Sequence, residues 1–227
     1  MKEVVVSGKG RLIIKILDWL NNNNNYKVSY FIPVVTSKSN PLKEWDNDDV
    51  FKFCSKNDIQ VIESGNFEDL PKKEIIFPQN HEYDILIVAF YKKIISKSQF
   101  ERFDKALNIH LSELPKYRGA RGINWALKNN ENFQGVTIHL IDELLDHGSI
   151  IAQSRFSIYP YYEEVIDVYY RALEHAFILF TQCFPNLDKI LPIPQKHSEA
   201  SYYSSKDFKN LGERETFLRS KSIDKHP

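Results

Sequence analysis

Short apolar runs that alternate with helical segments constrain the fold of this chain more than any other feature. Residues 84–90 (Asp-Ile-Leu-Ile-Val-Ala-Phe) and residues 4–6 (Val-Val-Val) are nearly continuous in apolar side chains. Between them, residues 10–20 place apolar side chains at helical spacing. Strands that are apolar along their whole length are buried on both faces. We therefore expect an α/β fold with a mostly parallel sheet and helices on both faces.

The rest of the chain extends this pattern. The same signals predict strands at residues 26–35, 59–62, 106–110, 135–141 and 150–158, and helices at 49–55, 123–128 and 163–184. Pro185, Pro192 and Pro194 follow the long helix, and the chain then becomes polar. We expect residues 1–191 to form one domain. Residues 192–227 are expected to form a short extension, a hairpin or arm used for docking or dimerisation.

Charge and cysteine usage narrow the possible partners. Thirty Lys and Arg residues balance thirty Asp and Glu residues, which gives no reason to expect nucleic acid or an anionic membrane as the main partner. Cys54 and Cys183 are far apart in sequence and indicate reduced thiols in a reducing compartment. Residues 1–6 show no signal-peptide pattern, and no apolar run approaches the ~20 residues needed to span a bilayer. These features predict a cytoplasmic protein.

The residues best suited to chemistry are an amide, an imidazole and a carboxylate. Asn108 and His110 lie at the carboxyl end of a predicted parallel strand, where ligands gather in open α/β sheets. Together with Asp146 they supply an oxyanion donor, a group that moves a proton, and a carboxylate that fixes the imidazole tautomer. These are the parts needed to move an acyl group onto an amine. His139 is expected to be structural, and its spacing with His110 and Asp146 matches no zinc pattern, so we expect no metal.

Three motifs around these residues resemble a known family. Residues 108–119 read Asn-Ile-His-Leu-Ser-Glu-Leu-Pro-Lys-Tyr-Arg-Gly, residues 135–137 read Gly-Val-Thr, and residues 146–151 read Asp-His-Gly-Ser-Ile-Ile. They resemble the Rossmann-like formyltransferases that use 10-formyltetrahydrofolate, closely over about residues 84–153. The resemblance implies that Asn108 stabilises an oxyanion, that His110 relays a proton, and that Asp146 orients His110.

The resemblance also implies a site for 10-formyltetrahydrofolate as co-substrate. The positions that match it lie at the end of the predicted strand at 84–90, after that strand, or before Asp146. They are Phe90, Tyr91, Lys92, Ile94 and Asp142. Lys92 stands where the family usually has a glycine.

Residues 117–127 resemble one branch of the family, the enzymes that formylate amino sugars carried on a nucleotide. The run Asn-Trp-Ala-Leu at residues 124–127 is typical of that branch. The resemblance implies a dTDP-linked acceptor, best matched by dTDP-4-amino-4,6-dideoxyglucose. It also implies a role in surface polysaccharide (O-antigen, lipopolysaccharide) synthesis, and a homodimer. The candidate acceptor-binding residues are Tyr117, Arg118, Gly119, Arg121, Asn124, Trp125, Lys9, Tyr202 and Tyr203. The glycines and arginines of residues 117–122 suit a phosphate group or a solvated surface loop, the turn at Lys9 suits a phosphate at a helix N-terminus or a simple tight turn, and Tyr202 and Tyr203 suit stacking on a base or packing within the protein.

Three alternative functions stay open: two formyltransferases with other acceptors and one protein that is not an enzyme. A glycinamide ribonucleotide formyltransferase usually has a G-x-G-S-N turn, whereas residues 8–12 read Gly-Lys-Gly-Arg-Leu. A methionyl-tRNA formyltransferase is disfavoured by the zero net charge and by the about 40 residues that follow the long helix. The third possibility is a catalytically silent module that binds folate or a nucleotide sugar. Retention of Asn108, His110 and Asp146 together argues against such a module.

Overall fold

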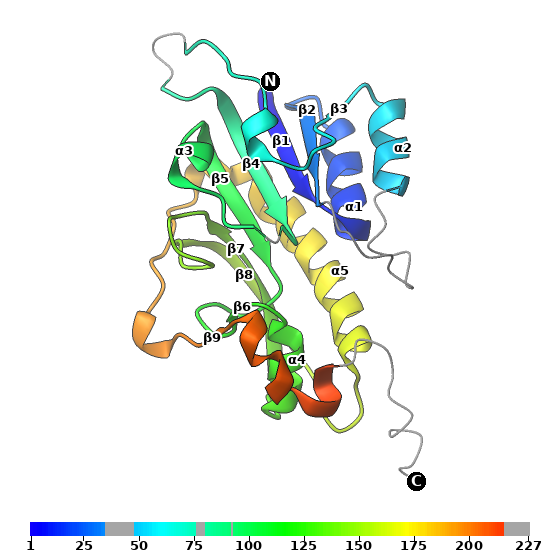
Figure 1. Cartoon of the computed structure of the whole chain (residues 1–227), viewed down its shortest axis with the longest axis vertical. Coiled ribbons are helices and arrows are strands. Elements are labelled where there is room, and N and C mark those ends of the chain that lie inside the picture. Colours follow the sequence, from blue (N-terminus) through cyan, green and yellow to red (C-terminus); the bar gives the residue numbers. More distant parts are fainter. Residues whose placement is uncertain (35–47, 76–79, 92, 216–227) are drawn as a thin grey trace. The chain divides into compact units, whose positions relative to one another are not determined.

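A computed structural model describes residues 1–34, 48–75, 80–91 and 93–215 (Figure 1). The chain divides into two compact units. The first unit comprises Met1–Ile109 and Leu140–Glu143, and the second comprises His110–His139 and Leu144–Pro227. Among the described residues, no helix is both long and apolar enough to cross a bilayer.

The first unit is built on a parallel sheet. Its strands are β1 (Lys2–Gly8), β2 (Tyr26–Pro33), β3 (Gln60–Val61), β4 (Tyr83–Ala89) and β5 (Phe103–His110), in the spatial order β3-β2-β1-β4-β5. Each neighbouring pair is parallel. Asn108 on β5 stands opposite Val88 on β4. The strand expected at residues 26–35 ends at Pro33, and residue 35 lies outside the described residues.

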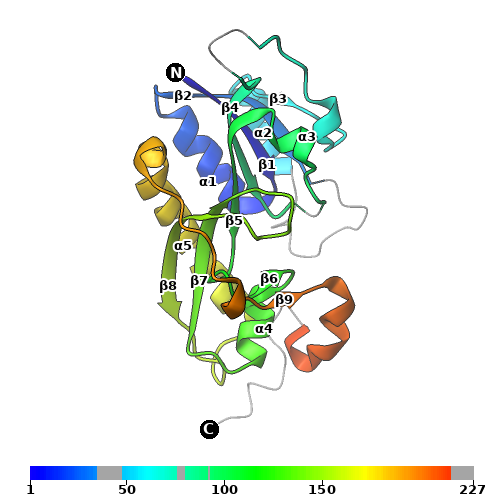
Figure 2. The same ribbon diagram turned by 90° about the vertical axis from the view of Figure 1, so that its left-hand side faces the viewer.

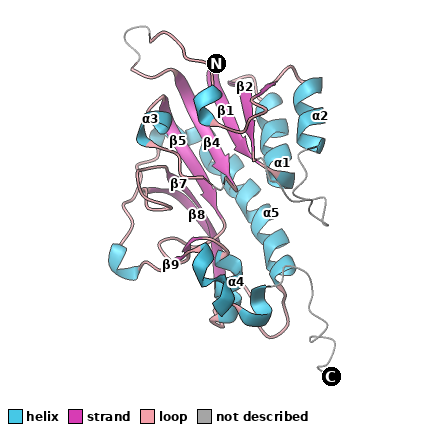
Figure 3. Ribbon diagram, in the orientation of Figure 1, coloured by secondary structure: helices cyan, strands magenta, loops and turns pink. Residues whose placement is uncertain are grey.

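The first unit also contains the helices α1 (Gly10–Asn21), α2 (Asp48–Lys56) and α3 (Lys97–Phe100). Figure 3 shows these helices in cyan. The apolar stripe of α1 is buried, including Leu12, Ile16 and Leu20, as its helical spacing predicts. Gly8 links β1 to this helix at φ +155°, and a Cβ there would lie 2.3 Å from the Ala89 carbonyl oxygen. Only glycine therefore fits where β1 passes this closely to β4.

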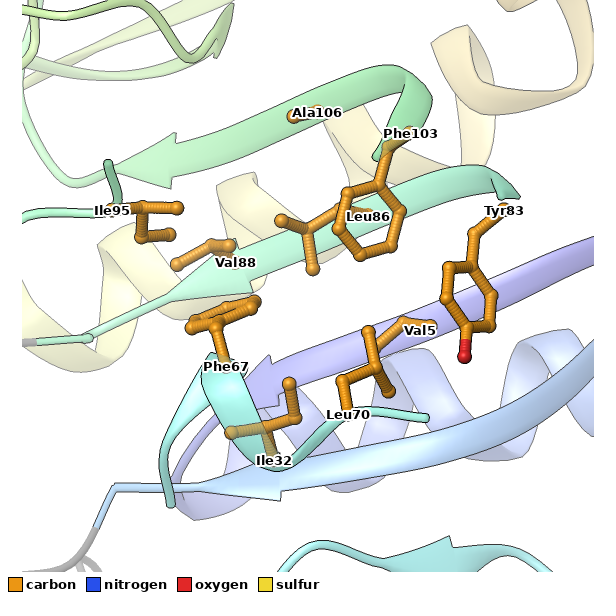
Figure 4. Close-up of a cluster of buried hydrophobic side chains, with 10 residues drawn as sticks. All are labelled: Val5, Ile32, Phe67, Leu70, Tyr83, Leu86, Val88, Ile95, Phe103 and Ala106. Carbon is orange, nitrogen blue, oxygen red and sulfur yellow. The ribbon is translucent and has the colours of Figure 1, made fainter. Parts of the chain in front are cut away.

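The core of the first unit covers the sheet face opposite α1. Side chains from β1, β2, β4 and β5 meet Phe67 and Leu70, which come from the short 3₁₀ segment Phe67–Asp69 and the residues after it (Figure 4). Val5 points into this cluster. Val4 and Val6 point to the other face of the sheet and are buried as well. Burial on both faces explains the uninterrupted apolar runs, and the expected α/β fold is confirmed.

The second unit combines an antiparallel strand pair with two helices. β7 (Phe133–Leu140) pairs antiparallel with β8 (Ile150–Ser157), and α5 (Val165–Cys183) packs against β8. The shorter helix α4 (Gly122–Lys128) contacts α5. α5 is followed by the 3₁₀ segment Phe184–Lys189, so the helix ends next to Pro185, as expected.

The described part of the extension folds onto the second unit. Its strand β9 (Tyr202–Tyr203) pairs in parallel with β6 (Arg118–Gly119), and the two lie side by side next to α4 (Figure 2). Three 3₁₀ segments complete it, at His197–Glu199, Ser205–Asn210 and Gly212–Glu215. Between residues 192 and 215, the extension therefore pairs with β6, a strand early in the second unit. The expected division at residue 191 and the dimerisation role stay predictions.

Candidate active site

Asp146 is the centre of a charged cluster in the second unit. It lies between β7 and β8, in the left-handed region at φ 50°, and its side chain is 6% exposed. One carboxylate oxygen, Oδ2, lies 3.5 Å from Nδ1 of His110 and accepts the backbone N–H of Gly119 at 2.8 Å. The other oxygen, Oδ1, lies 3.6 Å from Nε2 of His139. Two imidazoles therefore flank one buried carboxylate.

These neighbours decide the charge of Asp146. Burial on its own would raise the pKa of the carboxyl group. The charge of His110, the hydrogen bond and charge of His139, and the Gly119 N–H act in the opposite direction and prevail, so the pKa of Asp146 lies well below its ordinary range. The carboxylate is therefore ionised throughout the pH range in which imidazoles titrate.

His110 is the last residue of β5, and both of its ring nitrogens face oxygen acceptors. Nδ1 faces the Asp146 carboxylate, and Nε2 lies 2.9 Å from the carbonyl oxygen of Tyr117. The imidazole therefore bridges the Asp146 carboxylate and the backbone of the loop that follows β5.

The loop that carries the Tyr117 carbonyl is held by Thr137 and its neighbours. The Thr137 hydroxyl donates to the Ser112 carbonyl oxygen at 2.7 Å and accepts the backbone N–H of Leu114 at 3.1 Å. Gln153 on β8 donates to both the Leu114 carbonyl oxygen and the Thr137 hydroxyl. This network connects β7 and β8 to the loop after β5, and so supports the position of the acceptor that His110 faces.

Gly135 is required by the same packing. A Cβ at this position would lie 2.7 Å from the carbonyl oxygen of Ser154 and 3.0 Å from Cβ of Glu113. Contacts this short force the backbone apart. The Gly-Val-Thr motif thus has a physical basis here, with the glycine allowing close approach and Thr137 supplying the hydrogen bonds.

Asn108, the third member of the predicted trio, lies in β5 two residues before His110 and is half-buried. Because side chains alternate along a strand, Asn108 and His110 project from the same face of β5. Asn108 belongs to the first unit and His110 to the second. The structure brings His110 and Asp146 together within the second unit, and the roles assigned to the trio stay predictions.

The predicted folate-binding residues that are described belong to the first unit. Phe90 follows β4 at φ +63°, and Tyr91 packs edge-on against Phe67 with ring centroids 5.2 Å apart. The side chain of Ile94 is 74% exposed. Asp142 follows Ile141, which packs against the same core cluster as Tyr91. Lys92 lies outside the described residues.

Most of the predicted acceptor-binding residues contact the extension. Arg118 donates to Gln195 and to Nδ1 of His197, and Arg121 stacks on Phe208. Asn124 donates to the Arg214 carbonyl oxygen, and Trp125 and Tyr117 each stack on Tyr203. Tyr202 is 57% exposed. Lys9 precedes α1 in the first unit and is buried.

Two residues near Asp146 carry contacts that the sequence does not reveal. The sequence indicates a structural role for His139, yet this residue faces the second oxygen of the carboxylate. Gln195 donates to the backbone of the Asp146 turn, and no sequence motif marks it. The alternation of β7 places His139 on the same face as Thr137, and that is the only available signal. Among the described residues, no group of three His, Cys, Asp or Glu side chains is arranged to bind a metal.

Comparison with known proteins agrees with this architecture. A family model described as formyl transferase matches residues 1–183. The chain belongs to the formyl transferase family. The resemblance expected from the three motifs is thereby confirmed at the level of the family.

The relatives include methionyl-tRNA formyltransferases and sugar formyltransferases. The methionyl-tRNA formyltransferase of Finegoldia magna is 31% identical over 157 residues, which are 69% of this chain and 50% of the relative. This chain spans about half the length of the first curated relatives that it matches.

The solved structure of WlaRD, a sugar 3N-formyl transferase, has a TM-score of 0.75 and 24% identity, with 91% of this chain and 71% of that chain covered. A 4-N formyltransferase from Francisella tularensis has a TM-score of 0.70 and 23% identity, covering 92% of this chain and 78% of its own. At these identities the two structures establish the fold that they share with this chain.

Proposed function

We propose that this chain transfers the formyl group of 10-formyltetrahydrofolate to a primary amine. The observation that carries the proposal is the buried Asp146 carboxylate facing Nδ1 of His110, in a chain of the formyl transferase family. WlaRD was crystallised with 5-N-formyl-THF, which supports a folate as the formyl donor. Phe90, Tyr91, Ile94 and Asp142 are the described residues expected to contact it.

We assign each residue of the trio one role in the reaction. The amine attacks the formyl carbon, and a tetrahedral intermediate forms with negative charge on oxygen and positive charge on nitrogen. The Asn108 amide donates to that oxygen, which is typically worth 10²–10³-fold in rate for one donor. His110 takes the proton from the amine and returns one to N10 of the folate as the C–N bond breaks. Asp146 stabilises the imidazolium that exists between these two steps.

His110 must free one ring nitrogen to act in this way. Both nitrogens face acceptors, the Asp146 carboxylate and the Tyr117 carbonyl. The carbonyl is the neutral acceptor and the weaker partner for an imidazolium. We infer that Nε2 leaves Tyr117 when substrates bind, while Nδ1 stays with Asp146. Catalytic hydrogen bonds commonly rearrange in this manner between free and loaded enzymes.

We further propose that the acceptor is a nucleotide-linked amino sugar, with dTDP-4-amino-4,6-dideoxyglucose as the first choice. The support is the resemblance of residues 117–127 to that branch, together with the fold shared with sugar formyltransferases, one of them crystallised with dTDP. A product of this kind fits the synthesis of a surface polysaccharide such as the O-antigen of lipopolysaccharide. Action in the cytoplasm and a homodimeric state belong to the same proposal.

Methionyl-tRNA is the second candidate acceptor. The 31% identity to a methionyl-tRNA formyltransferase favours it, and the balance of acidic and basic residues does not. Glycinamide ribonucleotide is the third candidate acceptor, and a silent binding module would have no acceptor at all. One comparison of substrates distinguishes these four possibilities.

The experiment incubates the purified chain with 10-formyltetrahydrofolate and one acceptor at a time, and follows release of tetrahydrofolate. The acceptors are dTDP-4-amino and dTDP-3-amino sugars, methionyl-tRNA and glycinamide ribonucleotide. Formylation of a dTDP-amino sugar supports the proposal, turnover with methionyl-tRNA alone would replace it with the second candidate, and no turnover would leave the silent module. His110→Gln is expected to abolish turnover. His175→Gln, on α5 of the same unit, is the matched control and is expected to retain it.

A further inference from the structure

Gln195 is a buried polar residue in the extension. It is 6% exposed, between two exposed neighbours, Pro194 and Lys196. A buried carboxamide is costly unless its hydrogen bonds are made. The contacts of Gln195 therefore indicate what holds it in place.

Both ends of the carboxamide are used. The oxygen Oε1 accepts from Nε and Nη2 of Arg118 at 3.0 and 2.6 Å. The nitrogen Nε2 donates to the carbonyl oxygens of Asp146 at 3.0 Å and Gly148 at 2.8 Å. Two donors and two acceptors are paired, which is the full capacity of this side chain. Arg118 is also buried and also contacts Nδ1 of His197.

These contacts join the two backbone segments that position the Asp146 carboxylate. One segment carries the carboxylate itself, in a turn where Asp146 has φ 50°. The other is β6, where Gly119, next to Arg118, donates its N–H to the Asp146 carboxylate. Gln195 holds the backbone of the first segment through its nitrogen and the side chain of the second through its oxygen. The pairing of Ile150 with Ile193, 2.8 Å in each direction, fixes the start of β8 to the extension close by.

We propose that Gln195 is a positioning residue that sets the direction of the Asp146 carboxylate toward His110. The expected effect of Gln195 on the reaction rate rests on the proposed function. Its expected effect on the position of the Asp146 carboxylate rests only on the hydrogen bonds described above. It assigns to the extension a part in the reaction, through the backbone of the turn rather than through contact with a substrate. A displacement of about 1 Å at a reacting group can cost ~100-fold in rate, so two lost hydrogen bonds at this turn are expected to be visible in kcat.

The two ends of the carboxamide can be tested separately. Gln195→Glu keeps the size and keeps an oxygen facing Arg118, where it gains an ion pair. The oxygen that replaces Nε2 faces the carbonyl oxygens of Asp146 and Gly148, so the turn loses two hydrogen bonds and meets repulsion. Gln195→Met removes both ends. Lys196→Ala, at the exposed neighbouring position, is the matched control.

We expect Gln195→Glu to remain folded, to lower kcat by ~10- to 100-fold, and to change KM for the folate little, since only the carboxylate is displaced. Gln195→Met is expected to lose at least as much activity per folded molecule. A kcat for Gln195→Glu within about 2-fold of that of Lys196→Ala would overturn the proposal. So would a loss of activity in both Gln195 variants that only follows the folded fraction measured by circular dichroism.

A second measurement separates this proposal from the proposed function. The amide resonance of Gly119 and the ring ¹⁵N resonances of His110 report on contact with the Asp146 carboxylate. Both are expected to shift in Gln195→Glu and to stay in place in Lys196→Ala. If the wild-type chain formylates no acceptor, the proposed function fails, and these resonances alone decide the role of Gln195. Unchanged resonances in Gln195→Glu would then refute it.

Discussion

Asp146→Asn tests the electrostatic reasoning about the site most directly. Asparagine has the same shape as aspartate, and one of its polar atoms can still accept the Gly119 N–H. The substitution removes the negative charge that lies 3.5 Å from His110 and 3.6 Å from His139. It therefore separates the charge of Asp146 from its role as a spacer.

The size of the effect follows from the distance. Two opposite unit charges about 4 Å apart attract by about 4 kcal/mol when the effective dielectric constant is near 20. Desolvation of the carboxylate offsets part of this, and we take about 2–3 kcal/mol as the net stabilisation of the His110 imidazolium. Each ~1.4 kcal/mol corresponds to a factor of ten in rate. Asp146→Asn is therefore expected to lower kcat by about 10²-fold.

The assay is release of tetrahydrofolate at saturating acceptor. Glu199→Gln, which neutralises an exposed carboxylate in the same unit, is the control. Ring ¹⁵N resonances of His110 are recorded at neutral pH in the same variants. These resonances are expected to shift in Asp146→Asn and to stay in place in Glu199→Gln, because only the first substitution removes the carboxylate that Nδ1 faces. A variant that keeps more than a third of the wild-type kcat, with an unchanged His110 ring, would refute the assignment of Asp146.

Three further outcomes are expected. Gly135→Ala should lower the free energy of unfolding by about 1–3 kcal/mol in urea, because the new Cβ meets a carbonyl oxygen at 2.7 Å; an unchanged midpoint would contradict this. Thr137→Val leaves buried partners without their hydroxyl and should cost about 1–3 kcal/mol for each one left unpaired, measured in the same way. The pKa of Asp146 is depressed in the folded state, so the stability that it contributes is complete above the ordinary aspartate pKa of about 3.9 and declines as pH falls toward the lower folded value. The difference in unfolding free energy between wild type and Asp146→Asn should therefore shrink as the pH falls below about 3.9.

The sequence is most informative where burial is complete. It predicts β1 and β4 within one or two residues, because strands covered on both faces carry apolar side chains without interruption. It does not predict β6 and β9. Each is two residues long, and their neighbours Tyr117 and Ser201 are 84 residues apart in the chain. No periodicity exists in two residues, and pairing at such separation depends on the tertiary fold.

The same difference between local motifs and long-range contacts applies to the candidate site. His110 and Asp146 are predictable because the motif that each occupies is local. The contact of His139 with Asp146 is not, since a histidine in a buried strand gives no sign of what it faces. Gln195 is 77 residues from Arg118 and 49 from Asp146, and both of its hydrogen-bonded ends depend on how the extension returns to β6. Contacts of this range are visible only once the chain is folded.

The proposed acceptor is based on the resemblance of residues 117–127 to the amino-sugar branch of the family. The side chains of this segment also contact the extension. Five of its side chains contact the extension: Arg118 through Gln195, Arg121 through Phe208, Asn124 through Arg214, and both Tyr117 and Trp125 through Tyr203. The motif that resembles the amino-sugar branch is therefore, within the second unit, the surface on which the extension packs. A substitution in it acts first on the extension, and through Gln195 on the turn of Asp146. Arg118→Ala is therefore expected to lower kcat for every acceptor tested, rather than to change the preference among acceptors, in the assay of tetrahydrofolate release.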